Sequence, residues 1–403
     1  MAPRSRRPHL KPESKFESQI ARWLAAGVID AAAAERIRAF EAGDEKRATF
    51  RWPAILALAI GGLLVAASIT LFVAAHWDRL SPTECFAIVL FMVAAFHVAA
   101  AFAADKFSAL SVTFHAIGTI AFGAGIFLTG QIFNLQENWA TGILLWAAGA
   151  AAGYAVLRQW PQAALFAVLA PSWLVAQWGI TTRWGWRAEY PISAGLMALA
   201  AAYLSARRGA EDSATRKALA WIGGIALLPA CVVGIWAAVE TSHYTYEPWR
   251  ETVSAERQLA GWAIAILVPL AVGWLLSGAE SWKNALAVAW ACLATVTAIY
   301  SHTKKPGAYV ADPDFGMIVL LYAVCALGAA GLILWGFSDR RKERVNLGIA
   351  GFALTVLFFY FDGFMDKLDR SLSLLLLGVI CIAGGYALER TRRRLVAKME
   401  AAT

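Results

Sequence analysis

Charged side chains are scarce in this chain of 403 residues. Asp, Glu, Lys and Arg make up only 16% of the sequence, whereas soluble proteins average roughly 25%. Hydrophobic residues make up 59%, which argues against a soluble globular protein. The low charge content predicts a chain that lies largely within a lipid bilayer.

Sequence signatures of enzymes and metal sites are also missing. No GxSxG, HExxH, Walker A or GxGxxG motif stands in a suitable context. The five cysteines are widely separated, form no CxxC pair and are not grouped with histidine at zinc spacing, so packing is their expected role. We therefore expect no catalytic residue, no metal and no cofactor, and an enzyme is the weakest functional class.

The sequence instead contains a series of long apolar runs. Pro53 to Ala75 has no charge over more than the roughly 20 residues needed to cross the hydrocarbon core. The pattern recurs to the end of the chain and predicts an all-α, polytopic transmembrane helical bundle of about twelve spans. The predicted spans cover residues 53–75, 83–104, 109–133, 140–157, 161–178, 190–206, 218–239, 259–277, 282–300, 315–337, 345–361 and 371–388.

The distribution of cations between alternate loops predicts the orientation. The side that holds both termini carries 26 Lys and Arg residues, the opposite loops carry nine, and Lys283 near a span end completes the total of 36. Because cytoplasmic loops are enriched in Lys and Arg, both termini are predicted to be cytoplasmic. The net charge of +8 is therefore a topology signal, and nucleic acid is not an expected partner.

The chain divides into four predicted parts. In the first part, Gly27 is placed to stop one short helix and Asp30 to cap a second, which predicts a small cytoplasmic helical hairpin. The parts are residues 1–52 with this hairpin, a membrane core at 53–178, the remaining bundle at 179–388 and a basic cytoplasmic tail at 389–403.

Small residues at helical spacing, such as Gly149 and Gly153, indicate closely packed helices. No convincing internal repeat is visible, so the inverted-repeat design of many transporters is not supported. These features favour a compact bundle.

Two stretches resemble a known family. GGLLVAASITLFVAAHWDRLS, followed after two spans by GAGIFLTGQIFNLQENWATGILLWAAGAAAGYAVL, is similar to the bacterial predicted-membrane-protein family called domain of unknown function twenty-one fifty-seven. The strong similarity covers roughly residues 16–178 and departs from the family at His76, where the family usually has Asn. The resemblance implies a bacterial membrane location and a helical fold, but no activity.

Polar residues gather at the predicted periplasmic ends of the first four spans. They are His76, Trp77, Asp78, Arg79, Glu84, Gln131, Asn134 and Glu137. One interpretation is a polar vestibule that binds a small polar ligand or cations. The favoured alternative is anchoring, because Trp belongs at the membrane interface and Asp and Arg can pair to lock a turn.

Two histidines lie deeper within predicted spans. His97 is seven residues before the end of its span and His115 six after the start of the next, which places both about 10 Å into the membrane. The short DKFS turn makes the two helices antiparallel neighbours, so the histidines are predicted to be near neighbours. Ionisable residues in spans are typical of proton relays, but a neutral imidazole pair that ties helices together is favoured here.

Two functional classes remain. A protein that acts in the cell envelope through partners, as a sensory or assembly factor, is favoured; a transporter or channel for a small polar solute or ion is the alternative. The expected partners are the lipid bilayer, anionic lipid at the basic cytoplasmic loops and another membrane protein.

Overall fold

The computed structural model describes residues 20, 22–38, 81–132, 139–185, 187–207, 209, 212–243, 252–301 and 315–363, with isolated residues at 64 and between 375 and 390. The chain forms two compact units, Met1–Cys85 and Phe86–Thr403.

The first unit contains two short helical segments whose ends follow the sequence signals. Gly27 adopts a φ of +67° after the first segment, a conformation that glycine reaches without strain. Asp30 Oδ1 accepts a hydrogen bond of 2.6 Å from the backbone N–H of Ala33, so Asp30 caps the helix at residues 31–38 as predicted. The packing of the two segments as a hairpin stays a prediction.

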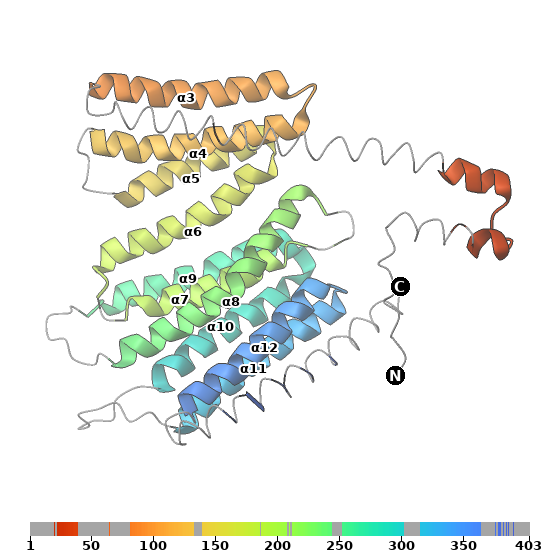
Figure 1. Ribbon diagram of the computed structural model, residues 1–403. Coiled ribbons are helices and arrows are strands. Elements are labelled where there is room, and N and C mark those ends of the chain that lie inside the picture. The colour runs from red at the N-terminus through yellow and green to blue at the C-terminus, as the bar shows by residue number, and fades with distance from the viewer. Residues whose placement is uncertain are drawn as a thin grey trace, which may run out of the picture. The chain divides into compact units, whose positions relative to one another are not determined.

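The larger elements of the described chain are helices (Figure 1). They are α3 (Pro82–Ala103), α4 (Ser108–Ile132), α5 (Trp139–Leu157), α6 (Trp160–Thr182), α7 (Glu189–Leu204), α8 (Ala214–His243), α9 (Ala255–Ser277), the short 3-10 helix η2 (Gly278–Glu280), α10 (Ser281–Ser301), α11 (Phe315–Ser338) and α12 (Lys342–Gly363). Ten of the predicted spans coincide with α3 to α12 within a few residues, and the other two, 53–75 and 371–388, fall outside the continuously described ranges.

Eight helical segments within the described ranges are long and apolar enough to cross a membrane. One of the eight, Ala255–Ser301, contains α9, η2 and α10, and the chain leaves α9 at Gly278 with a φ of +56°. Helix α7 is not among the eight because it has only 16 residues, about 24 Å of helix, and the hydrocarbon core is roughly 30 Å thick. The protein is thus a multi-pass helical membrane protein.

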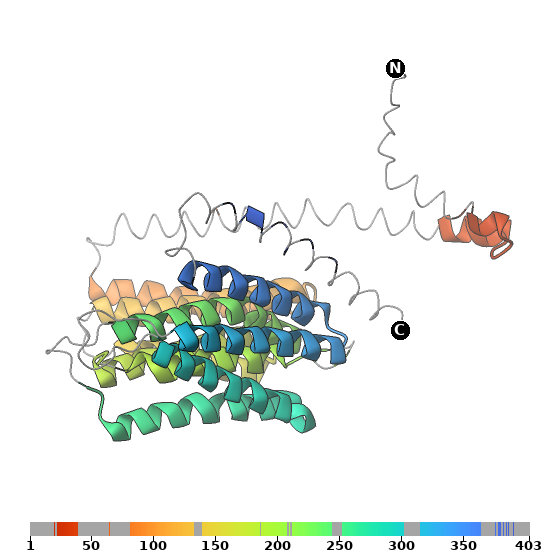
Figure 2. The same ribbon diagram turned by 90° about the horizontal axis from the view of Figure 1, so that it is seen from below.

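Helix α7 forms the core of the second unit, where α8, α9 and α10 all pack against it (Figures 1 and 2). Most of its side chains are buried, and many are alanine. Small side chains let the neighbouring backbones approach: a Cβ atom added to Gly223 of α8 would lie 2.4 Å from the Leu204 amide nitrogen and 2.5 Å from the Ala200 carbonyl oxygen. The α7–α8 contact therefore depends on the glycine.

The predicted small-residue stripe of α5 also faces neighbouring helices. A Cβ atom on Gly149 would lie 2.5 Å from the Phe122 ring of α4, and one on Gly153 would lie 3.0 Å from Gln162 Oε1 of α6. Helix α6 in turn meets α7, because the Tyr203 hydroxyl donates a hydrogen bond of 2.9 Å to the Ala167 carbonyl. These contacts connect the family-like first helices to the α7 core.

Candidate functional site

Most of the predicted outer polar cluster lies outside the described residues. This applies to His76, Trp77, Asp78, Arg79, Asn134 and Glu137. Gln131 lies in the last turn of α4, and its side chain is not described. The vestibule and the anchoring interpretation both stay predictions.

Glu84 is the member of this cluster whose side chain is described, and it starts α3. Its Oε2 accepts hydrogen bonds from both the backbone N–H and the hydroxyl of Ser81, each at 2.7 Å. The Ser81 hydroxyl oxygen in turn accepts from the Glu84 backbone N–H at 3.4 Å. This reciprocal arrangement is a capping box, which satisfies N–H groups that a helix start leaves without partners. The Glu84 carboxylate thus has a structural use.

The two intramembrane histidines are in direct contact. His97 of α3 and His115 of α4 place their Nδ1 atoms 2.9 Å apart, with ring centroids 5.2 Å apart. The same interface is continued by the Phe96 and Phe114 rings, whose centroids are 6.3 Å apart. Their equal depth and the short turn between the helices predicted that these two histidines are neighbours. The structure brings them together.

This contact determines which protons the rings carry. An N–H···N hydrogen bond needs one Nδ1 with a proton and one without, so the two neutral rings must be opposite tautomers. One ring then has a free Nε2 acceptor and the other an Nε2–H donor. Such a pair can pass a proton from one ring to the other, whereas two fully protonated rings would lose the bond. The pair is chemically able both to tie helices and to relay a proton.

Three further helical side chains extend the pair into a polar seam. The Thr119 hydroxyl and the Gln162 side-chain amide donate to the His115 carbonyl at 3.0 and 3.2 Å. The Trp146 indole N–H donates to the Thr119 carbonyl at 2.9 Å. We call His97, His115, Thr119, Trp146 and Gln162 the histidine seam, since it links α3, α4, α5 and α6.

Gln162, Thr119 and Trp146 were not predicted as members of this site. A glutamine inside an apolar span is a usable signal, because an amide in hydrocarbon needs hydrogen-bond partners. The residue is fully buried in the described structure, but its partner on α4 is 47 positions away in the sequence. Sequence periodicity carries no information on that pairing.

A second polar group ties α7, α9 and α10 together. The Asn284 side-chain amide donates to the Ser277 hydroxyl oxygen at 2.8 Å and to that of Ser205 at 3.2 Å. The two serine hydroxyls lie 2.7 Å apart, and Ser205 also donates to the Ala202 carbonyl. All three residues are buried, so these bonds link helix ends at a point that water does not reach.

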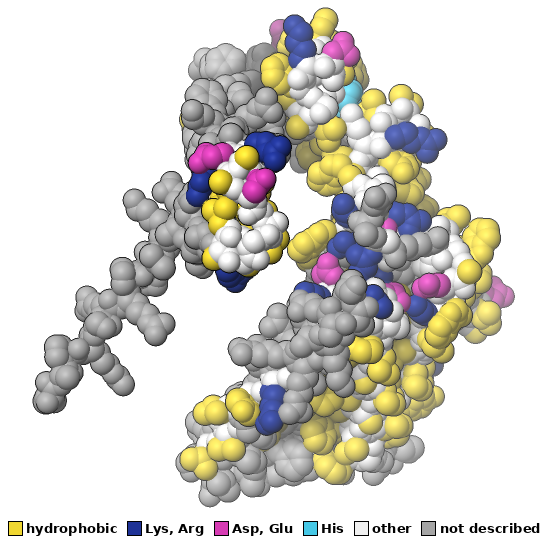
Figure 3. All heavy atoms as spheres, turned by 90° about the vertical axis from the view of Figure 1, so that its right-hand side faces the viewer, with side chains coloured by type: hydrophobic (Ala, Val, Ile, Leu, Met, Phe, Trp, Pro, Cys, Tyr) yellow, Lys and Arg dark blue, Asp and Glu magenta, His cyan; other side chains and the backbone are white. Residues whose placement is uncertain are grey.

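An ion-pair network covers the same end of the bundle, where the α7–α8, α9–α10 and α11–α12 connections meet. Figure 3 views this end and shows acidic and basic side chains gathered on it. The network consists of Arg207, Asp212, Glu280, Lys283, Asp339, Arg341, Glu343 and Arg344. In the sequence, the cations of this network predict only the topology, and the acidic residues in the same short loops are the signal for pairing.

Two carboxylates form the centres of this network. The Asp212 side chain, only 4% exposed, pairs with Arg207 at 3.5 Å and with Arg341 at 3.2 Å. Asp339 pairs with Lys283 at 2.7 Å and with Arg344, whose side chain is 2% exposed. Burial alone would raise the pKa of Asp339, but the hydrogen bond from Lys283 and the charge of Arg344 outweigh it and hold this pKa below its ordinary value of 3.8.

The family comparison covers the segment that contains the histidine seam. Residues 21–163 match the family described as Predicted membrane protein (DUF2157). Neither a curated protein nor a solved structure matches the chain. The matched residues lie within the range that carried the predicted resemblance, which is thereby confirmed. Residues 21–163, which include the histidine pair, are thus similar to the predicted membrane protein family DUF2157.

Proposed function

We propose that this protein is a non-enzymatic component of the bacterial inner membrane that acts in the cell envelope through partner proteins, as a sensory or assembly factor. The observation that carries the proposal is that polar side chains inside the bundle form hydrogen bonds between helices. His97 bonds to His115, and Asn284 bonds to two serines, so these groups bond across helix interfaces within the bundle. Polar groups engaged in this way hold helices together and are not available to replace the hydration of a passing solute.

The proposal includes twelve spans with both termini in the cytoplasm. The 26 to nine distribution of cations supports this orientation. The ion-pair network then lies at the cytoplasmic end, because its loops follow α7, α9 and α11. An even number of spans is what places the two termini on one side.

Reporter fusions test this orientation. Fusions after Arg208, Arg341 and Arg394 are expected to behave as cytoplasmic, and fusions near Tyr244 and Tyr309 as periplasmic, because these positions alternate between the predicted sides. The measurement is paired alkaline phosphatase and fluorescent-protein activity in cells. A cytoplasmic signal at Tyr244 would contradict the twelve-span arrangement.

The alternative function is a transporter or channel for a small polar solute or ion, and one observation favours it. The histidine pair can relay a proton, and Gln162 Oε1 in the same seam is buried without a hydrogen-bond partner. An unpaired buried acceptor costs about 1–3 kcal/mol, a cost that a bound proton carrier would remove. The solute most compatible with this seam is therefore the proton.

Proton flux distinguishes the two functions. The full chain is reconstituted into vesicles that enclose a pH-sensitive dye, and a potassium gradient with valinomycin supplies the driving voltage. We expect proton uptake no faster than in vesicles without protein, because the seam is proposed to tie helices together. The His115→Gln variant is expected to behave in the same way.

Rapid proton uptake by the natural chain that is lost in the His115→Gln variant would contradict the partner-based function. It would support the transporter or channel instead. Thr113→Val is the matched control, since the Thr113 hydroxyl is on the same helix and bonds only locally to the Ala109 carbonyl at 2.9 Å. Uptake lost in both variants would indicate misfolding, which a melting measurement on each variant identifies.

A further inference from the structure

Helix α6 contains a proline at its centre. Pro171 has no N–H, so the Ala167 carbonyl one turn earlier lacks the main-chain donor that it would have in a helix without proline. The Tyr203 hydroxyl of α7 supplies a donor instead, at 2.9 Å from the Ala167 oxygen. Because Ala167 is buried, its carbonyl depends on this side chain from another helix for a hydrogen-bond partner.

The two halves of α6 are fixed to different parts of the bundle. Before Pro171, the Gln162 side-chain amide donates to the His115 carbonyl of α4 at 3.2 Å. After Pro171, the Trp178 indole N–H donates to the Ala188 carbonyl, next to the start of α7, at 2.7 Å. Pro171 therefore lies between the attachment of α6 to the family-like first helices and its attachment to the α7 core.

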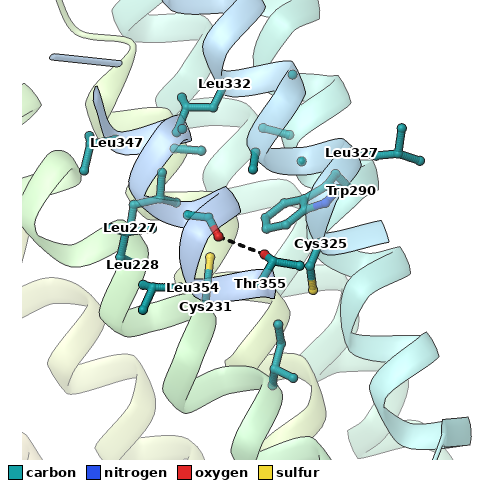
Figure 4. Close-up of a pocket in the computed structure, with 18 of the residues that line it drawn as sticks. Leu227, Leu228, Cys231, Trp290, Cys325, Leu327, Leu332, Leu347, Leu354 and Thr355 are labelled. Carbon is teal, nitrogen blue, oxygen red and sulfur yellow. Dashed lines mark hydrogen bonds between the residues drawn. The ribbon is translucent and has the colours of Figure 1, made fainter. Parts of the chain in front are cut away.

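Unfilled space borders the helices that form this connection. Pro171 lines a small apolar cavity of about 80 Å³ together with residues of α7 and α9. Helix α8, on which α6 packs, lines a larger apolar cavity of about 930 Å³ between itself, α10, α11 and α12 through Leu227, Leu228 and Cys231 (Figure 4). A close-packed interior resists the displacement of a helix, whereas these cavities leave α6 and α8 room to shift.

We propose that Pro171 is a hinge in α6 and that the Tyr203 hydroxyl is the latch that holds it. While Tyr203 bonds to Ala167, the first half of α6 is held against α7. When this bond opens, the first half of α6 tilts at Pro171 relative to the α7 core and carries α4 and α5, which pack on it. The hinge rests on the contacts of α6 alone and holds whether the protein acts through partners or as a transporter.

Melting temperatures of the full chain in detergent test the latch. Tyr203→Phe is expected to lower the melting temperature by about 2–4 °C, because the Ala167 carbonyl loses its donor. In a chain that also carries Pro171→Ala, the same substitution is expected to have less than half this effect, since the new N–H at position 171 can donate to Ala167. An equal effect of Tyr203→Phe in both chains would overturn the latch.

A second proline of the same helix supplies the matched control. Pro161 stands in the first turn of α6, where the helix needs no main-chain donor from it. Pro161→Ala is therefore expected to leave the effect of Tyr203→Phe unchanged. A reduction by Pro161→Ala as large as that by Pro171→Ala would contradict the assignment of the hinge to position 171.

Distances between two spin labels test the hinge itself. The labels are attached at Lys106→Cys, in the α3–α4 turn, and Lys217→Cys, in the first turn of α8, in a chain whose five natural cysteines are replaced by alanine. With Tyr203 present, we expect one narrow distribution of distances. Tyr203→Phe is expected to broaden it, and Pro171→Ala to narrow it again.

Two results would overturn the hinge. One is an unchanged distance distribution in Tyr203→Phe, which would show a contact between helices without movement at Pro171. The other applies if Tyr203→Phe fails to fold, because the double variant with Pro171→Ala then decides. A folded double variant would support the latch, and a double variant that also fails to fold would overturn it.

Discussion

Replacing Gly223 with alanine is expected to lower the free energy of unfolding by about 1–3 kcal/mol or more, because the added methyl group overpacks a backbone contact. The new Cβ atom would lie 2.4 Å from the Leu204 amide nitrogen and 2.5 Å from the Ala200 carbonyl oxygen. Neither backbone atom can rotate away as a side chain can. Helices α7 and α8 must therefore separate, and α7 is the helix around which the second unit packs.

The adjacent glycine supplies the control for this prediction. A Cβ atom on Gly224 would meet only methyl groups of Leu347 and Leu204, at ordinary distances of 3.6 and 3.7 Å. Gly224→Ala is expected to melt within a few degrees of the natural chain, and Gly223→Ala well below it, when both are measured by thermal unfolding in detergent. Equal melting temperatures for the two variants would show that α7 and α8 are not packed as described.

Replacing Asp339 with asparagine is expected to lower the free energy of unfolding by about 3–5 kcal/mol, because it removes one partner of a buried ion pair. The Arg344 side chain, 2% exposed, would retain hydrogen bonds to the Leu204 and Arg207 carbonyls but lose its compensating negative charge. Lys283 would lose the same partner. Chemical unfolding of the purified variant measures the loss.

Glu280→Gln is the matched control for the Asp339 variant. Glu280 also pairs with Lys283, at 2.8 Å, but its side chain is 62% exposed, so the change is expected to cost less than about 1 kcal/mol. A similar loss of stability in both variants would show that the ion pairs of Asp339 contribute no more to stability than the exposed pair of Glu280.

The pKa shift of Asp339 adds a pH dependence with a definite sign. Because the folded-state pKa is lower than the ordinary value of 3.8, the pair contributes stability at pH values above that value. The contribution is lost as the pH falls through the folded-state pKa. Asp339→Asn is therefore expected to show a weaker loss of stability on acidification than the natural chain.

Most of the helices were predictable because their apolar runs have the length of a membrane crossing. The central position of α7 was not, since its residues are apolar like those of the other runs, and its shorter length of 16 residues does not show that they are buried. Loop charges predicted a topology, but the pairing of Asp212 with Arg341, 129 positions later, depends on tertiary packing.

The histidine contact was predictable for a physical reason. A short turn makes successive helices antiparallel, and helical rise then equates the depths of His97 and His115. Gln162 belongs to a helix two elements later, and neither its depth nor its facing direction follows from a local pattern. Local geometry thus predicted the pair, and only tertiary structure revealed the rest of the seam.

We propose that polar groups inside this membrane bundle, such as His97 and His115, hold helices together and do not form a path for a solute. An experimental structure of the protein in lipid nanodiscs tests it most directly. We expect His97 Nδ1 and His115 Nδ1 within hydrogen-bond distance and no continuous file of water beside them. Histidine Cα atoms more than roughly 15 Å apart, well beyond the 8–10 Å spacing of packed helix axes, or a water-filled path that joins the two membrane faces, would contradict it.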